Sequence, residues 1–171
     1  MRKREGKMQK LILALSMILL VAGSAAAHGN ISKLPDSVQI LQYKMKLYMN
    51  ADDADTKNKL AMAYFRTNQL DEAKKELTSI LEKDANNFDA LDGMGVVLIK
   101  EGNGAEALKY LHRALAINEK DVMIHVHLSI AHTQLNQPDL ARNEMDKAKS
   151  LASGTEELPR IQEEVKLITN S

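Results

Sequence analysis

The strongest constraint on the fold of this chain is an internal repeat of 34 residues. Stepping 34 residues from Ala107 reaches Ala73 in one direction and Ala141 in the other, so the same small residue occurs three times. Large apolar residues recur at the same interval, as at Leu77, Leu111 and Met145. Small side chains at a fixed period are required where two helices cross, because a branched side chain would push the helix axes apart. The repeat therefore predicts pairs of closely packed helices.

Each repeat has the apolar spacing of helices. In the middle repeat, Leu108, Leu111 and Leu115 recur at positions i, i+3 and i+7. Asn87 and Asp121 stand just before predicted helices, where their side chains can cap free N–H groups. We predict two helices of about 13 residues in each repeat, joined by a short turn. The three repeats are placed at 54–87, 88–121 and 122–155.

Gly93 and Gly95 raise the alternative of a phosphate-binding loop, because G-x-G sequences can hold a phosphate. Such a loop follows a strand and has a third glycine, and neither feature is found here. Both glycines instead fall within a predicted helix, on the period of its apolar face. We therefore predict that they allow close helix packing.

The repeat resembles the tetratricopeptide repeat (TPR), a helix-turn-helix unit of the same length. The family's late Ala-x3-Phe is matched by Ala107 and Leu111, and its early Leu-Gly by Leu60-Ala61 and Met94-Gly95. The family's early Trp is missing, and its place is taken by Lys57, Leu91 and His125. The resemblance covers residues 54–155 and implies an all-α fold, a right-handed superhelical solenoid of three helix-turn-helix (TPR) repeats with an N-terminal helix and a C-terminal capping helix.

Helices are also predicted on both sides of the repeats. Within the N-terminal segment 28–53, residues 37–50 place Val38, Leu41, Met45 and Tyr48 on one side of a helix. This helix is expected to cap the first repeat; the alternative is that it lies in a binding groove. Within 156–171, residues 157–168 place Ile161, Val165 and Ile168 on one face, which can cover the last repeat.

The first 27 residues have the pattern of a cleavable signal peptide. Residues 1–10 hold five Lys or Arg and one Glu, residues 11–23 are apolar, and Ser24-Ala-Ala-Ala27 fits a cleavage site. The apolar run is too short for a membrane anchor, which needs about 20 residues. Met8 is an alternative start. We therefore expect an exported protein, most simply periplasmic, with secretion as the alternative and no stable membrane anchor after cleavage.

Composition excludes several kinds of function. Residues 28–171 carry 18 Lys or Arg and 22 Asp or Glu, and they form no basic stripe, so no nucleic-acid partner is expected. The chain has no Cys, so an exported form must be held together by its core without disulfides. No nucleophile or nucleotide motif is present, and we predict a protein that is not an enzyme.

The family resemblance implies a concave groove that binds a peptide or helix and is lined by the first helix of each repeat. The central row at the matching positions is Met62, Val96 and Ile130, with Phe65, Ile99 and Thr133 beside it. Arg66 and Lys100 flank this row on one side, and Asp89 and Asp92 lie at the other edge with Asp55. We expect an exposed apolar stripe between a basic and an acidic rim, suited to an amphipathic helix of a protein partner.

Other family members grip a C-terminal carboxylate with Lys, Asn and Arg. Here the matching places hold Asn58, Met62, Gly93, Met123 and His127, so this clamp is not expected. Four histidines, His112, His125, His127 and His132, suggest a metal or haem ligand set. No two of them stand at i, i+3 or i, i+4, and His125 and His127 point to nearly opposite sides of a helix. Packed or surface histidines, with no cofactor and no metal, are therefore expected.

Two functions remain open beside the weaker metal or haem hypothesis. The first is a non-enzymatic scaffold or adaptor of the bacterial cell envelope that binds a partner in its groove, as exported relatives do in envelope assembly. The second is a self-associating structural protein, a homodimer in which the helix at 37–50 of one copy enters the groove of another.

Overall fold

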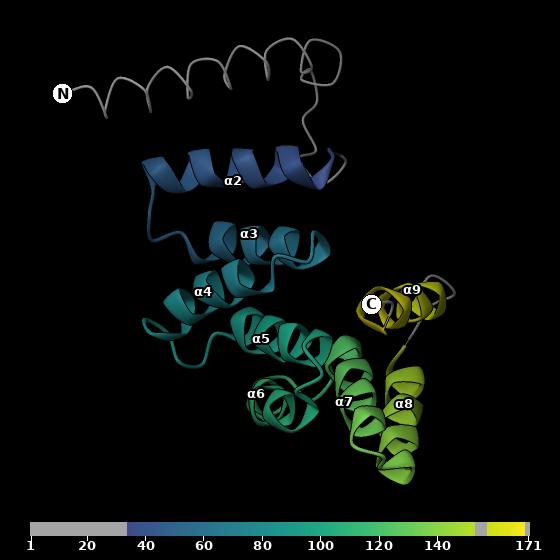
Figure 1. Cartoon of the computed structure of the whole chain (residues 1–171). Helices are drawn as coiled ribbons and strands as arrows, with labels where there is room; N and C mark the ends of the chain where they lie inside the picture. The colour runs from purple at the N-terminus through teal and green to yellow at the C-terminus, as the bar shows by residue number, and fades with distance from the viewer. Residues whose placement is uncertain (1–33, 153–156, 170–171) are drawn as a thin grey trace, which may run out of the picture. The chain divides into compact units, whose positions relative to one another are not determined.

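The computed structural model describes residues 34–152 and 157–169, which form one compact unit from Pro35 onward. The predicted signal peptide lies outside the described residues. The described part is built from helices, and no strand occurs in it. In chain order they are α2 (Asp36–Met49), α3 (Ala54–Arg66), α4 (Leu70–Leu81), α5 (Phe88–Lys100), α6 (Gly104–Ile117), α7 (Val122–Gln134), α8 (Pro138–Leu151) and α9 (Glu157–Thr169) (Figure 1).

Small residues lie where the helices of each pair cross, as the repeat predicts. Ala73, Ala107 and Ala141 are all buried, in α4, α6 and α8. A Cβ at Gly95 of α5 would lie 2.4 Å from Leu111 Cδ2 of α6, so a larger residue there would displace the Leu111 side chain or push the two helices apart. The pairs α3/α4, α5/α6 and α7/α8 therefore pack through small residues, and α5 also contacts the first helices of both neighbouring pairs.

The turns and helix starts repeat with the same period. Asn68, Gly102 and Asn136 have φ values of 58°, 81° and 54°, so each pair is linked through one left-handed residue. Asn87 accepts a hydrogen bond from the Ala90 N–H at 3.1 Å, and Asp121 accepts from the Met123 N–H at 2.9 Å. These caps satisfy the free N–H groups at the starts of α5 and α7.

Helix α2 packs on α3 with a different face from the predicted one. It buries Gln39 and Tyr43, while Tyr48 of the predicted apolar side is 88% exposed. Arg66 at the end of α3 forms an ion pair with Asp36 at 2.7 Å and donates to Gln39 Oε1 at 3.1 Å. These polar contacts hold the Gln39 face of α2 against α3.

Helix α9 lies beside α5 and α7 (Figure 1), which are its principal packing partners. Ile161 and Ile168 of α9 are 5% and 2% exposed, so the predicted apolar face is turned inward. The sequence predicts a cap on the last repeat, but α9 reaches across α7 to the middle repeat as well. Its apolar face packs against first helices of two repeats instead of continuing the stack.

Helix α7 is enclosed on all sides. Each residue from Met123 to His132 is buried, because α5, α6, α8 and α9 all pack against this helix. A helix that is surrounded in this way must satisfy its polar side chains within the protein. No helix among the described residues combines the length and the apolar character that crossing a membrane requires.

Candidate protein-binding groove

The first helices of the repeats form a surface that faces α9, and we call this surface the groove. It contains two hollows, both partly lined by α9. Four predicted residues line the first hollow: Met62, Asp89, Asp92 and Val96. Three line the second: Phe65, Arg66 and Lys100. The remaining predicted positions, Ile99, Ile130 and Thr133, line neither hollow.

The apolar stripe of the groove is not open to solvent, contrary to the prediction. Phe65, Val96, Ile99 and Ile130 are all at most 6% exposed. Met62 is half-buried and Thr133 is exposed. The physical reason is twofold: the first helices pack closely against their own second helices, and α9 lies over α5 and α7. Most of the stripe therefore belongs to the core.

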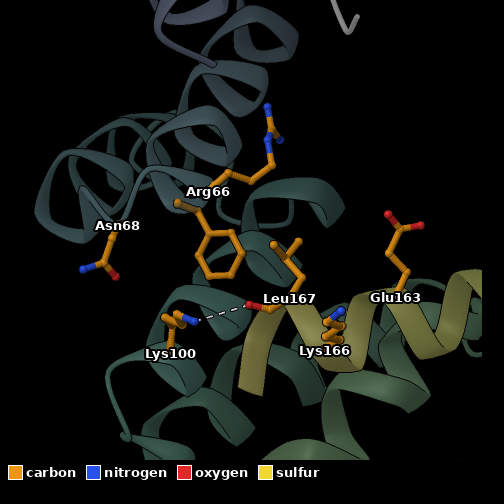
Figure 2. Close-up of a pocket in the computed structure, with 7 residues that line it drawn as sticks. Arg66, Asn68, Lys100, Glu163, Lys166 and Leu167 are labelled. Atoms are coloured by element: carbon orange, nitrogen blue, oxygen red, sulfur yellow. Dashed lines mark hydrogen bonds between the residues drawn. The ribbon is translucent and has the colours of Figure 1, made fainter. Parts of the chain in front are cut away.

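The basic edge of the groove is formed at the ends of α3 and α5. Lys100 donates a hydrogen bond to the Leu167 carbonyl of α9 at 3.3 Å. Figure 2 shows Arg66, Asn68 and Lys100 across the second hollow from Glu163, Lys166 and Leu167 of α9. Arg66 lines this hollow while its guanidinium binds Asp36 of α2. The two predicted basic residues thus share one hollow but have different partners.

The acidic edge lies at the starts of α5 and α7. Asp89 and Asp92 line the first hollow together with Asp121 and with Arg160 of α9. Partial burial, followed by the neighbouring carboxylates of Asp92, Asp55 and Asp121, raises the pKa of Asp89. The groove therefore has negative charge where α5 and α7 begin and positive charge where α3 and α5 end.

His127 of α7 stands between these edges and is the polar centre of the groove. Its Nδ1 donates to Asp92 Oδ1 of α5 at 2.6 Å, and its Nε2 lies 3.6 Å from Glu164 Oε1 of α9. The second distance is too long for a hydrogen bond, so Nε2 is buried without one. Burial alone would lower the pKa of His127, but Asp92 and then Glu164 outweigh it and raise the pKa to about 10. His127 is thus a buried cation between two carboxylates.

In the sequence, His127 occupies a position that matches the family's carboxylate clamp, but no clamp is expected there and His127 is not among the predicted groove residues. One signal could have found it: His127 and Asp92 are one repeat plus one residue apart, on the first helices of adjacent repeats. Residues at that separation face one another across neighbouring first helices. The carboxylate of Glu164 comes from a helix outside the repeats, and no periodicity indicates it.

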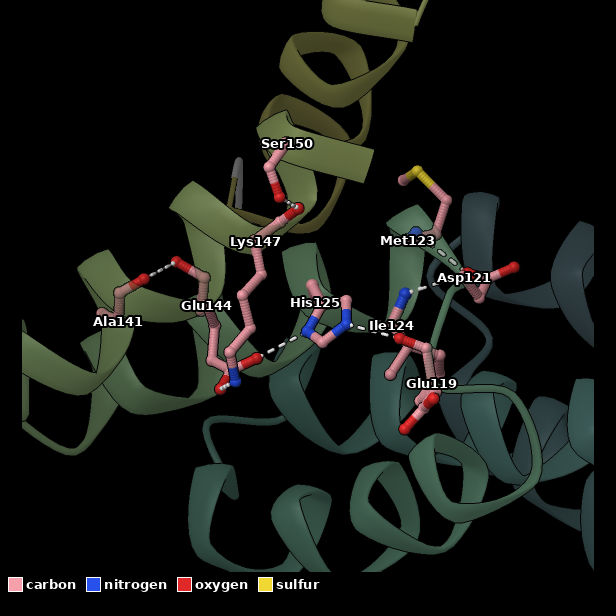
Figure 3. A network of polar contacts seen from close by, with 10 residues as sticks. Glu119, Asp121, Met123, Ile124, His125, Ala141, Glu144, Lys147 and Ser150 are labelled. Carbon is pink, nitrogen blue, oxygen red and sulfur yellow. Dashed lines mark hydrogen bonds and ion pairs between the residues drawn. The ribbon is translucent and has the colours of Figure 1, made fainter. Parts of the chain in front are cut away.

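The other histidines have separate partners. His125 Nδ1 is 2.6 Å from Glu144 Oε2 of α8, and its Nε2 is 2.9 Å from the Glu119 carbonyl (Figure 3). His132 Nδ1 is 2.7 Å from Gln137 Oε1, and His112 is exposed. Within the described ranges, no three His, Cys, Asp or Glu side chains are arranged to hold a metal ion.

Stacked helix pairs with a groove along their first helices define the class of helical-repeat proteins. Tetratricopeptide repeat models match residues 54–87 and 98–158, together more than half of the chain. The chain belongs to the tetratricopeptide repeat family, and the predicted fold class is confirmed.

Solved structures of this fold resemble the chain at low sequence identity. MamA residues 41-end from Desulfovibrio magneticus RS-1 is 22% identical with a TM-score of 0.61, over 84% of this chain and 75% of that one. A crystal structure of MamA is 21% identical with a TM-score of 0.59, over 75% and 82% of the two chains. The first TPR domain of human RPAP3 is 20% identical with a TM-score of 0.56, over 69% and 96%.

The match is partial for some of these structures. The chain spans 64% of the MamA structure from MSR-1, which is less than two thirds of its length. The search of curated proteins found no relative that matches this sequence. At these identities the likeness concerns the fold.

Proposed function

We propose that this protein is a non-enzymatic protein-binding scaffold whose groove binds a helix of a partner protein. The observation that carries the proposal is the position of α9. An amphipathic helix already lies on α5 and α7 and buries Ile161 and Ile168 there, so the groove has the shape and the chemistry to hold a helix. Binding an amphipathic helix along an apolar surface is a common mode of peptide recognition.

The charges at the two edges support the same proposal. A helix carries partial positive charge at its N-terminus and partial negative charge at its C-terminus. The acidic edge near Asp89 and the basic edge near Lys100 complement these two ends. A helical partner would therefore gain from both edges as well as from the apolar contacts.

Site-specific photocrosslinking in producing cells tests the proposal. A benzophenone amino acid is placed at Met62, which lines the groove and is half-buried. The matched control carries the same group at Lys109, an exposed position on α6. We expect Met62 to yield one or a few discrete adducts that Lys109 does not, and Lys100→Glu to weaken them by removing the basic edge.

The masses of the adducts distinguish the outcomes. An adduct with a different protein supports the scaffold, whereas an adduct of twice the chain mass supports the alternative of a self-associating homodimer. The same adducts from both positions, or none from Met62, would contradict binding in the groove. Sequencing the crosslinked peptide should give a partner segment with the apolar period of an amphipathic helix.

We also propose that the protein is exported to the bacterial envelope, on the basis of the signal-peptide pattern in residues 1–27. N-terminal sequencing of the protein from the producing cell checks this proposal. We expect the mature chain to begin at His28. A chain that retains residues 1–27 and fractionates with the cytoplasm would overturn it.

A further inference from the structure

Helix α9 presents a simple chemical pattern to the groove. Ile161, Glu164 and Ile168 are at i, i+3 and i+7, and they share the face that is turned toward α5 and α7. Both isoleucines are buried, and Glu164 between them approaches His127. The neighbouring Gln162, Glu163 and Lys166 are exposed. The groove thus accommodates an apolar, an acidic and an apolar residue in that order.

The repeats alone position a histidine that can bind the acidic residue of a helix in the groove. His127 is held by Asp92 of the adjacent repeat, which fixes the ring and leaves Nε2 aimed toward α9. That nitrogen is buried and makes no hydrogen bond in the described chain. A buried cationic ring with one unsatisfied N–H favours a carboxylate on whatever helix lies over it.

The charges at the edges also fix the direction of the bound helix. Arg160, in the first turn of α9, lies at the acidic edge with Asp89 and Asp121. Leu167, in its last turn, accepts the hydrogen bond of Lys100 at the basic edge. The positive N-terminal and negative C-terminal ends of the helix dipole therefore meet charges of opposite sign. A helix in the reverse direction would meet charges of the same sign.

We propose that α9 is an internal occupant of the partner site, and that the partner is an amphipathic helix of the same pattern: an aliphatic residue, a carboxylate three residues later and a second aliphatic residue four residues after that. The partner helix runs from the acidic edge to the basic edge and displaces α9. This inference rests on the proposed function and specifies the chemistry of its ligand.

The partner needs contacts that α9 does not make, because a tethered helix competes at a high effective concentration. Such contacts are available near α3, which is not among the principal packing partners of α9. The second hollow, about 590 Å³, lies there between Phe65, Asn68 and α9. The partner helix is therefore longer than α9, or carries a larger side chain at its C-terminal end, and fills this hollow.

Peptide binding to the full-length chain tests the inference. The probe is a fluorescent peptide with the sequence of residues 157–171, and its anisotropy is followed. Ile161→Asp with Ile168→Asp releases α9 in place, because each carboxylate would otherwise be buried. We expect this variant to bind the peptide at least about tenfold more tightly than the wild type, whose own α9 competes.

The role of the Glu164 carboxylate is tested with two modified peptides, each of which carries one substitution relative to the parent peptide. A peptide with Glu164→Gln should bind at least about tenfold more weakly, because it loses the charge opposite His127. A peptide with Gln162→Lys changes the net charge by the same amount at an exposed position that lines neither hollow, and it should bind as the parent does. Equal binding of the two modified peptides would overturn the assignment of the acidic residue.

A second pair of full-length variants provides a test that does not depend on correct folding of the double mutant. Glu164→Lys places a cation opposite His127 and should release α9 without a buried apolar change. Gln162→Lys adds a cation at an exposed position of α9 that lines neither hollow, and it should not release the helix. We expect peptide binding to appear in the first variant alone, with the helical circular dichroism of both unchanged. Equal peptide binding by wild type and both released variants, or by none of them, would overturn the proposal.

Two further results separate this inference from the proposed function. If crosslinking at Met62 captures a partner but no released variant binds the peptide, the scaffold function stands and the α9 pattern does not describe its ligand. If neither experiment gives a signal, both fail. If light scattering instead shows that the wild-type chain forms a dimer in which two copies exchange α9, the ligand of the groove is a second copy of this chain. The assignment of a different partner protein would then be overturned.

Discussion

His125 and His127 stand two residues apart on α7 and belong to two different kinds of site. Each ring places Nδ1 2.6 Å from a carboxylate oxygen, so the local chemistry is the same. The partner of His125 is Glu144, in the second helix of the same repeat. The partners of His127 are Asp92 of the preceding repeat and Glu164 of α9. One histidine joins the helices of a pair, and the other joins separate parts of the chain.

The difference shows which contacts can change without unfolding the repeats. The contact of His125 is reinforced by the whole α7/α8 pair, including the bond from Ser129 Oγ to the Ala141 carbonyl at 2.7 Å. The contact of His127 with Glu164 is reinforced mainly by two isoleucines of one helix. Because few contacts hold α9 in the groove, another helix can replace α9 there while the repeats stay folded.

The largest effect should come from His127→Ala. It leaves the carboxylates of Asp92 and Glu164 near one another without the cation, and we expect the free energy of unfolding to fall by about 3 kcal/mol. Hydrogen exchange should show loss of protection in α9 before any loss in α8. His112→Ala, at an exposed histidine, is the control and should change stability by less than about 0.5 kcal/mol. Unchanged protection of α9 would show that His127 does not hold it.

A rise in pH should have the next largest effect. The pKa of His127 is raised in the folded chain from 6.5 to about 10. Its stabilising contribution is therefore complete below pH 6.5 and is lost as the pH rises toward 10. We expect the free energy of unfolding to fall by about 2 kcal/mol between pH 6.5 and 8.5, measured by urea denaturation. The charged groups that act on this site are Asp92 from α5, Glu164 and Arg160 from α9, and Arg66 from α3.

The control for the pH series is His127→Ala, which should lose this slope between pH 6.5 and 8.5. Glu164 contributes with the opposite sign, because the nearby His127 lowers its pKa below the ordinary 4.5. Its contribution is present above pH 4.5 and is lost as the pH falls through its lowered value. An equal slope in wild type and variant would assign the pH dependence to another group.

A smaller effect is expected for His125→Gln. A glutamine can replace one of the two contacts of the ring, with Glu144 or with the Glu119 carbonyl, and stability should fall by about 1 kcal/mol. Hydrogen exchange should increase in α8 and at the start of α7, while α9 stays protected. This pattern is the reverse of that for His127→Ala. Loss of α9 protection in the His125 variant would remove the distinction between the two sites.

The smallest effect is expected for Arg160→Gln. This exposed residue faces the acidic edge, and its loss should weaken the docking of α9 by about 0.3 kcal/mol. Exchange rates of α9 at low and at high salt measure the change. The difference between wild type and variant should disappear at high salt, because the interaction is screened. A salt-independent difference would indicate a packing contribution from Arg160.

The fold could be predicted because its determinants are local and repeated. Ala73, Ala107 and Ala141 mark the helix crossings, and each is buried where the period requires it. The opposite orientation of His125 and His127 also follows from helical geometry alone. These features depend on residues within one repeat or in adjacent repeats, and a single sequence contains that information.

The positions of charged residues on the first helices could be predicted from the sequence, but the burial of the apolar stripe between them could not. Asp89 and Asp92 line the first hollow and Lys100 lines the second, while their role in binding a partner stays a prediction. Whether Val96 is exposed depends on where α9 packs, and an amphipathic helix outside the repeats has several surfaces that could bury it. The period of α9 identifies which of its faces is apolar, and the surface that receives this face is decided by tertiary contacts. For the same reason, the pairing of Glu164 with His127 could not be predicted.

Chain order gives the groove two different states while the chain folds. The helix pairs form between segments that are adjacent in the sequence, so they can close in order as the chain emerges N-terminus first, from the ribosome or from an export channel. Helix α9 follows all three pairs, and Glu164 must return to His127 on α7, which Asp92 of α5 already holds. A ligand that is present before α9 has emerged therefore meets an unoccupied groove, whereas one that arrives later must compete with the chain's own last helix.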